Sequence, residues 1–284
     1  PFTPYGGITL KSGNVEAILI IDNSSSMFLK DTVWARIDIA VREINDLFAS
    51  RTIIEGDKVA LFAFGSETSR RVPLTNDFNL FINEVNLIGR PNTLIGDNIY
   101  WSSDMANAFK RTSVLIDRQD MIFEFGREVE NWQPTPKQNR MILILTDGAD
   151  LFVSSGEEKI DKDNTANFND SIKELNLRNI KVYPIGIGTK RGALMTDILS
   201  DYKEGKDYPP KLKEDLKNQI SRLNVRGLEY LKGATNSDGP FLMENYKISA
   251  NRFISSALNK HRSMLIEPVA SDEREELWRY FLMA

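Results

Sequence analysis

Three oxygen-bearing side chains follow an apolar run near the start of the chain. Residues 15–21 read VEAILII, and Asp22, Ser24 and Ser26 come next, at alternate positions. Alternate side chains of an extended segment point to the same side, so these oxygens can face a single point. Carboxylate and hydroxyl oxygens are hard ligands, which suit Mg²⁺, Mn²⁺ or Ca²⁺ rather than zinc.

Two more residues of the same chemistry lie further along the chain. Asp147 follows a second apolar run, RMILILT at 140–146, and Thr93 lies in the loop RPNTLIGDN at 90–98. A small hard cation takes about six oxygens at close range. Because hydroxyl ligands are uncharged, they neutralise the ion only in part, and an open position would attract a carboxylate from another molecule. The five residues therefore indicate binding chemistry more than catalysis.

Apolar runs of strand length alternate with amphipathic helices along the chain. We expect strands at 15–21, 58–64, 140–146, 181–188 and 240–244, and helices at 34–48, 77–88, 97–113, 166–178 and 246–260. This alternation predicts an α/β fold: a doubly wound, mostly parallel sheet with helices on both faces. Residues 69–74 should form one antiparallel edge strand, because Pro73 cannot donate to a ladder. In such sheets ligands bind beyond the carboxyl ends of the strands.

The length of 284 residues suits one large domain with short flanking segments. We expect a lead-in at 1–14, the domain at 15–262, and at 263–284 a linker toward a possible membrane helix. Two stretches fit the alternation poorly, near 114–138 and 189–225, and are interpreted as solvated surface insertions. The chain starts at Pro1 rather than Met, so we expect an excised or processed fragment of a longer protein.

Composition narrows the classes of function. The chain has no Cys, which excludes disulfides, thiolate metal sites and a Cys nucleophile. Its 36 basic and 40 acidic residues are interspersed, which argues against a nucleic-acid partner. The apolar runs are far shorter than the roughly 20 residues that span a bilayer.

The combination of Asp22-x-Ser24-x-Ser26, Thr93 in NTLIGDNI and Asp147 in LTDG resembles the metal-ion-dependent adhesion site of von Willebrand factor A domains. The resemblance implies that Ser24, Ser26 and Thr93 bind a divalent cation, Mg²⁺ first and Mn²⁺ or Ca²⁺ as alternatives. It also implies that Asp22 and Asp147 bind partly through water, and that an acidic residue of a protein partner completes the shell. Asn92 departs from the Gly that precedes the Thr in many relatives, although Asn tolerates positive φ well.

Flanking stretches resemble membrane-anchored bacterial proteins of the Bat (aerotolerance) type. These stretches are RVPLTND, NTLIGDNI and the closing EREELWRYFLMA, whose aromatic and apolar end is typical of the start of a membrane helix. The resemblance implies a domain that faces the periplasm from the bacterial inner membrane. It further implies a role in the assembly or maturation of periplasmic complexes, and association with a MoxR-type AAA+ ATPase.

Four residues near these motifs have ordinary structural explanations. Asp97 is expected to cap a helix or to hydrogen-bond to the ligand residues, rather than to bind the ion itself. Asp150 is expected to be a solvated acid in a loop. Gly148 is expected to permit the turn after its strand. His261 is the one histidine. It lies between Lys260 and Arg262 on a polar helix, so we expect it on the surface, which argues against a Ser-His-Asp triad.

A phosphotransfer enzyme of the haloacid-dehalogenase type is the alternative function, since that class also places an Asp after its first strand. Its second acid would fall at Ser24, which is a poor proton donor at neutral pH. A P-loop and a dinucleotide-binding turn are disfavoured, because GxxxxGK[ST] is absent and DNSSSM holds no Gly.

Overall fold

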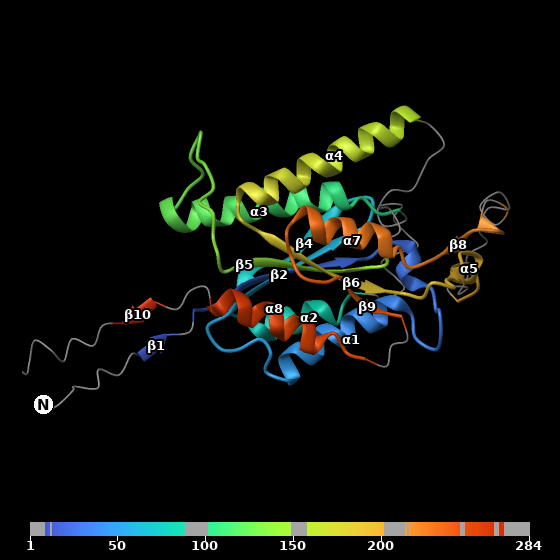
Figure 1. The fold of residues 1–284 in the computed structure, drawn as a ribbon, viewed down its shortest axis with the longest axis horizontal. Helices are drawn as coiled ribbons and strands as arrows, with labels where there is room; N and C mark the ends of the chain where they lie inside the picture. The colour runs from blue at the N-terminus through green and yellow to red at the C-terminus, as the bar shows by residue number, and fades with distance from the viewer. Residues whose placement is uncertain are drawn as a thin grey trace, which may run out of the picture.

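A six-stranded sheet with five parallel strands forms the centre of the molecule (Figure 1). The computed structural model describes residues 9–11, 13–88, 102–148, 158–201, 214, 216–244, 248–263 and 267–269. The strand order is β4-β3-β2-β5-β6-β9, and only β4 runs antiparallel to its neighbour. The strands are β2 (Glu16–Asp22), β3 (Lys58–Phe64), β4 (Thr68–Thr75), β5 (Arg140–Thr146), β6 (Lys181–Ile187) and β9 (Phe241–Met243). The expected fold class is confirmed.

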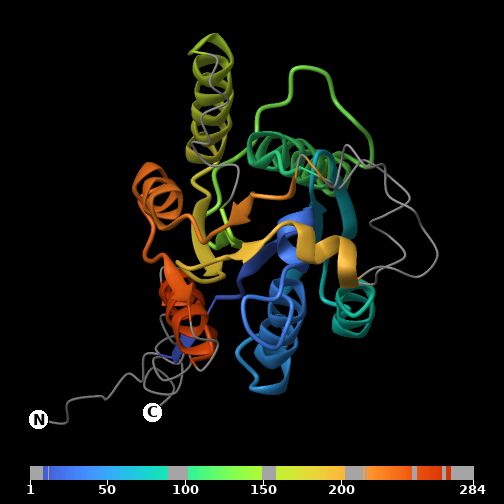
Figure 2. The same cartoon turned by 90° about the vertical axis from the view of Figure 1, so that its right-hand side faces the viewer.

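Both faces of the sheet are covered by helices. On one face lie α1 (Arg36–Ala49), α2 (Phe78–Val85) and α8 (Asn251–Ser263), whose buried side chains join one core cluster. On the other face lie α3 (Met105–Phe125), α4 (Glu158–Leu177) and α7 (Val225–Ala234), which join a second cluster. Figures 1 and 2 show the sheet between these two layers.

The continuous apolar strands follow from this layering. Every residue of β2 and of β5 is buried, because alternate side chains enter the two different cores. Ile18 and Ile20 lie in the cluster under α3, while Leu19 and Ile21 lie in the cluster under α1. Burying one such aliphatic side chain stabilises the fold by about 1.5–3 kcal/mol.

The edge strand has the expected place. β4 pairs antiparallel with β3 at one border of the sheet, and the register shifts between the Val59–Thr75 and Leu61–Val72 pairs. Pro73 lies inside that irregularity, where its missing N–H costs no ladder bond. The predicted last strand at 240–244 is confirmed as β9.

Helix α3 corrects one expectation. Residues 114–125 do not leave the fold as a surface insertion, because α3 continues through them to Phe125. Ile116 is 1% exposed and joins the core with Phe109, so the apolar stripe extends beyond residue 113. The helix ends where Gly126 adopts φ 70, a left-handed conformation that terminates helices.

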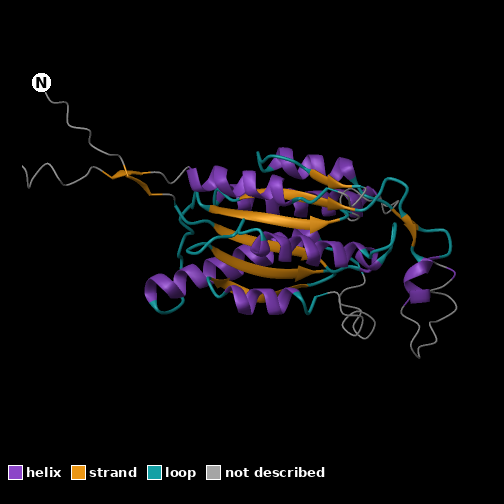
Figure 3. Cartoon of the chain, turned by 90° about the horizontal axis from the view of Figure 1, so that it is seen from below, coloured by secondary structure: helices purple, strands orange, loops and turns teal. Residues whose placement is uncertain are grey.

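The second expected insertion contains regular structure of its own. Within 189–225 lie β7 (Ala193–Leu194), β8 (Ile220–Ser221) and α5 (Thr196–Asp201), and β7 pairs antiparallel with β8. Figure 1 shows β8 and α5 at one end of the sheet. At the other end, β1 (Thr9–Lys11) pairs antiparallel with β10 (Glu267–Val269), as Figures 1 and 3 show.

No helix among the described residues is long and apolar enough to cross a bilayer. The closing WRYFLMA, residues 278–284, lies outside the described part of the chain.

The expectation of a surface histidine is wrong. His261 is 1% exposed, and its Nδ1 lies 2.7 Å from the carbonyl oxygen of Gln138. A carbonyl only accepts, so Nδ1 carries the proton and Nε2 accepts from the Tyr183 hydroxyl at 3.1 Å. Burial lowers the pKa of His261 below its usual 6.5 and raises the pKa of Tyr183 to about 12. The polar neighbours of His261 in the sequence do not indicate these two partners, because Gln138 and Tyr183 come from distant segments.

His261 should make folding stability depend on pH. Because its pKa is lower in the folded chain than the usual 6.5, the unfolded chain binds the proton first. The free energy of unfolding should therefore be highest above about pH 6.5 and fall as pH decreases from there towards the folded-state pKa. Chemical denaturation of wild type and His261→Gln across this window measures the effect. An equal slope in both proteins would contradict the prediction.

Candidate metal-binding site

Two carboxylates meet where adjacent strands end. β2 and β5 run parallel in register up to the Ile21–Leu145 pair, so Asp22 and Asp147 emerge at the same edge of the sheet. Both side chains are 0% exposed. The Thr146 hydroxyl donates to Asp22 Oδ2 at 2.5 Å and ties the first acid to the second strand. Strand order reverses around β2, which is where open sheets bind ligands.

The two serines lie in the turn that follows Asp22. This turn continues as the 3-10 helix η1 (Ser25–Phe28). The Ser24 N–H donates to Asp22 Oδ1 at 2.9 Å, and the Ser24 and Ser26 hydroxyl oxygens are 3.2 Å apart. Both serines are buried. The alternate spacing therefore places the two hydroxyls together beside the first carboxylate, as the sequence predicts.

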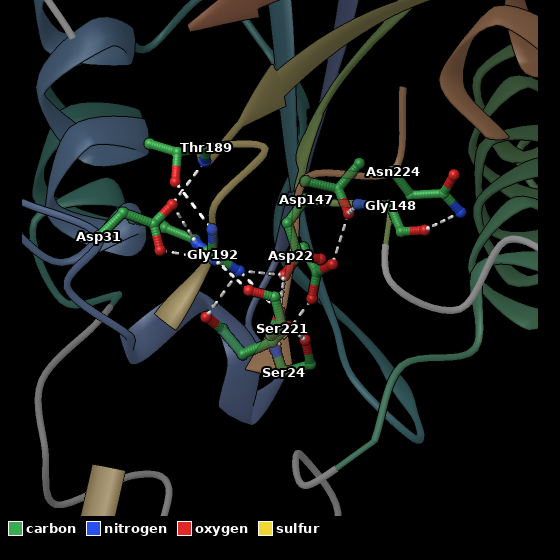
Figure 4. A network of polar contacts seen from close by, with 12 residues as sticks. Asp22, Ser24, Asp31, Asp147, Gly148, Thr189, Gly192, Ser221 and Asn224 are labelled. Carbon is green, nitrogen blue, oxygen red and sulfur yellow. Dashed lines mark hydrogen bonds and ion pairs between the residues drawn. The ribbon is translucent and has the colours of Figure 1, made fainter. Parts of the chain in front are cut away.

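A guanidinium that sequence reasoning missed binds Asp31, Asp147 and Ser221, three residues of the polar network in Figure 4. Arg36, the first residue of α1, is 0% exposed and donates from Nη1 to Asp147 Oδ2 at 2.6 Å. Its Nε and Nη2 donate to the two oxygens of Asp31 at 3.2 and 2.7 Å. Such a two-pronged contact fits a planar guanidinium and not an ammonium.

Arg36 also reaches the segment 189–225. Its Nη1 donates to the Ser221 hydroxyl at 2.8 Å and its Nη2 to the Ser221 carbonyl at 3.0 Å. The Ser221 hydroxyl donates in turn to Asp147 Oδ2 at 3.1 Å. Next to it, the Asn224 N–H donates to the Asp147 carbonyl at 2.9 Å. Both ends of Asp147 are therefore positioned by residues 221–224.

Glycines at the strand ends leave room for these groups. A Cβ on Gly188, at the end of β6, would lie 3.2 Å from Arg36 Nε, and the residue has φ 143. Gly148 has φ 70, which confirms that it permits the turn after β5. The sequence shows both glycines but does not show which side chain needs the space.

Several predicted residues lie outside the described part of the chain. Thr93 is among them, so its proximity to the Asp22–Ser26 turn stays a prediction. Asn92, Asp97 and Asp150 also lie outside the described residues. The structure brings together the other four predicted ligands, Asp22, Ser24, Ser26 and Asp147. Their role as ligands also stays a prediction.

The donor set fits a hard divalent cation. Carboxylate and hydroxyl oxygens are the ligands that such ions prefer. Asp22, Asp147, Ser24 and Ser26 are buried and supply both kinds of oxygen at the same strand ends. Within the described residues, no three His, Cys, Asp or Glu side chains gather as a metal cluster.

Comparison with known proteins supports the fold. Residues 17–149 match the model of the von Willebrand factor type A domain family. The conserved hypothetical protein BatB from Bacteroides thetaiotaomicron is 19% identical, with a TM-score of 0.61 over 88% of this chain and 100% of that one. An aerotolerance-related membrane protein from Bacteroides fragilis is 17% identical, with a TM-score of 0.57 over 89% and 100%. At these identities the two structures show a shared fold. No curated protein matches the chain in sequence.

Loss of the Arg36 guanidinium should destabilise the domain strongly. Arg36→Met leaves Asp31 and Asp147 buried beside an apolar side chain, and breaking such a pair costs about 3–5 kcal/mol. Arg111→Met is the control, since that arginine on α3 is exposed and its replacement should change stability by less than about 0.5 kcal/mol. Denaturant unfolding measures both. Similar values for the two variants would contradict the electrostatic role of Arg36.

Proposed function

Since residues 17–149 match the von Willebrand factor type A domain family, we propose that the chain is a protein-binding module that depends on a divalent cation. The carrying observation is the convergence of Asp22, Ser24, Ser26 and Asp147 at the carboxyl ends of two adjacent strands. When bound, the cation supplies positive charge and a coordination position for a carboxylate of the partner.

The chain's own residues would bind the ion in two ways, directly and partly through water. The hydroxyls of Ser24 and Ser26, 3.2 Å apart, are proposed as direct ligands together with Thr93. Asp22 and Asp147 are proposed to act partly through water. This assignment fits the hydrogen bonds of the two carboxylates, because each already accepts hydrogen bonds from protein groups. Mg²⁺ is the proposed ion, with Mn²⁺ and Ca²⁺ as alternatives.

We further propose that the domain faces the periplasm from a bacterial inner membrane and serves the assembly or maturation of protein complexes, with a MoxR-type AAA+ ATPase as associate. One of the two similar structures is described as an aerotolerance-related membrane protein. The pairing of β1 with β10 supports the orientation, because it joins the two flanking segments at the end of the sheet remote from the site. An anchor attached there would leave the site facing away from the membrane.

Binding is favoured over phosphotransfer. Von Willebrand factor type A domains are typically interaction modules rather than enzymes. Both oxygens of Asp22 accept hydrogen bonds, from the Ser24 N–H and the Thr146 hydroxyl, which lowers their nucleophilicity. The position of a second acid is taken by the buried Ser24.

Mg²⁺ titration tests the cation site. Wild type should bind Mg²⁺ in calorimetry and gain thermal stability from it, because a ligand that binds only the folded state raises the free energy of unfolding. Ser26→Ala should weaken binding by at least about tenfold, which corresponds to about 1.4 kcal/mol. Ser25→Ala is the matched control, because it removes a neighbouring hydroxyl of the same turn. Equal affinities of wild type, Ser26→Ala and Asp22→Ala would remove the assignment.

Turnover of a generic phosphate ester separates the two functions. We expect no hydrolysis above background by wild-type protein with Mg²⁺, because no acid follows Asp22 at the position of Ser24. Robust turnover that disappears in Asp22→Asn would establish the phosphotransfer alternative instead.

A further inference from the structure

Large apolar side chains are exposed beside the candidate metal-binding site. Val33 and Trp34, in the segment between η1 and α1, are 77% and 56% exposed. Leu194 in β7 and Ile220 in β8 are 42% and 41% exposed. We call these four residues the rim patch. Single exposed apolar residues need no explanation, but a group next to a binding site indicates an interaction surface.

Short connections tie the rim patch to the site. Ile220 immediately precedes Ser221, whose hydroxyl donates to Asp147, and Ile220 pairs with Leu194 across the β7–β8 ladder. Consecutive Cα atoms are about 3.8 Å apart. Ile220 is therefore one residue away from Ser221, which hydrogen-bonds to the predicted ligand Asp147. Val33 and Trp34 lie between Asp31 and Arg36, which bind each other.

The two halves of the rim patch are locked together. Arg36 binds Asp31 on one side and Ser221 on the other, while Asp31 Oδ2 accepts from the Thr189 N–H at 2.6 Å (Figure 4). Segments from distant parts of the sequence are thereby held in one arrangement before any partner arrives. Preorganisation of this kind lowers the entropic cost of binding.

Basic residues predominate in the segments that carry the patch. In the segments 29–35, 188–195 and 219–224 the exposed charged residues are Lys30, Lys190, Arg191 and Arg222, of which Lys190 pairs with Glu244. The one acid in these segments, Asp31, has a side chain that is 0% exposed under Arg36. A partner that lies here meets positive charge and apolar surface together, with the proposed cation adding to the positive field.

We propose that the rim patch binds an acidic and apolar protein segment, in which a carboxylate for the cation lies within two positions of a bulky apolar residue. The proposal rests on the proposed function and adds the partner's chemistry to it. The carboxylate occupies the open position of the ion, and the apolar residue packs on Trp34, Val33, Leu194 and Ile220. Further acids of the segment face Arg191 and Arg222.

A displayed library of random peptides, selected on immobilised wild-type protein with Mg²⁺, tests the proposal. The selected peptides should place Asp or Glu within two positions of Phe, Leu, Ile or Trp, and a chelator should release them. The double variant Val33→Ser, Trp34→Ser should lower recovery of the selected peptides by about tenfold, equal to about 1.4 kcal/mol. Phe123→Ser on α3, which removes an 86% exposed aromatic outside the patch, should change recovery less than about twofold.

The outcomes separate the patch from the cation. Selection without an acid–apolar pair, no selection at all, or equal recovery on the double variant overturns the proposal. Recovery that a chelator abolishes and the double variant leaves unchanged keeps the cation site and removes the rim patch. Recovery that depends on Trp34 but survives the chelator keeps the patch as a surface and removes the proposed cation dependence. Sedimentation of the protein with phosphatidylglycerol vesicles, lost in the double variant, with no peptide selected, would replace the protein segment by a lipid surface.

Discussion

A fully buried guanidinium is the constraint on which the site depends. Arg36 is 0% exposed, and removing a charge from water is costly unless partners restore what hydration supplied. Asp31, Asp147 and Ser221 provide those partners, and all three come from different segments. The same contacts that make the burial of Arg36 tolerable therefore fix the relative position of the loops around the strand ends. Lysine has no planar fork and cannot replace this geometry.

The parallel sheet explains why the predicted ligands share one edge. β2 and β5 are neighbours with aligned register, so the residues that follow them leave the sheet side by side. The Thr146–Asp22 hydrogen bond joins the two ends directly. The site thus inherits its geometry from strands buried on both faces, which are the most rigid part of the fold. Loops alone would not hold hydroxyls and carboxylates in so constant an arrangement.

Residues of the segment 189–225 contribute to the site in addition to the central sheet. Ser221 and Asn224 bind the side chain and the carbonyl of Asp147, so residues 221–224 lie directly against the site. Its hairpin also exposes Leu194 and Ile220 beside the strand ends. Stability of the site and the shape of the surface around it therefore depend on the same few hydrogen bonds. Changes in this segment would alter both at once.

The sequence by itself determined the sheet, its helical layers and the alternate oxygens of Asp22, Ser24 and Ser26. These features depend on periodicity, which reports burial of apolar side chains and the side on which neighbours point. The first part of α3, up to residue 113, followed from the same signal, but residues 114–125 did not. Beyond Ile116 the helix exposes Ile122 and Phe123, and the stripe that marks a core-facing helix fades.

Only the tertiary structure decided which polar side chains are buried and which groups they bind. Arg36 and Arg42 look alike in sequence on one helix, yet the first is 0% exposed and the second has a side chain 45% exposed. His261 likewise is buried because Gln138 and Tyr183 meet it from elsewhere. The physical reason is that a polar group is buried only where partners compensate its lost hydration. Those partners are brought together by folding, so their identity cannot be derived from local spacing.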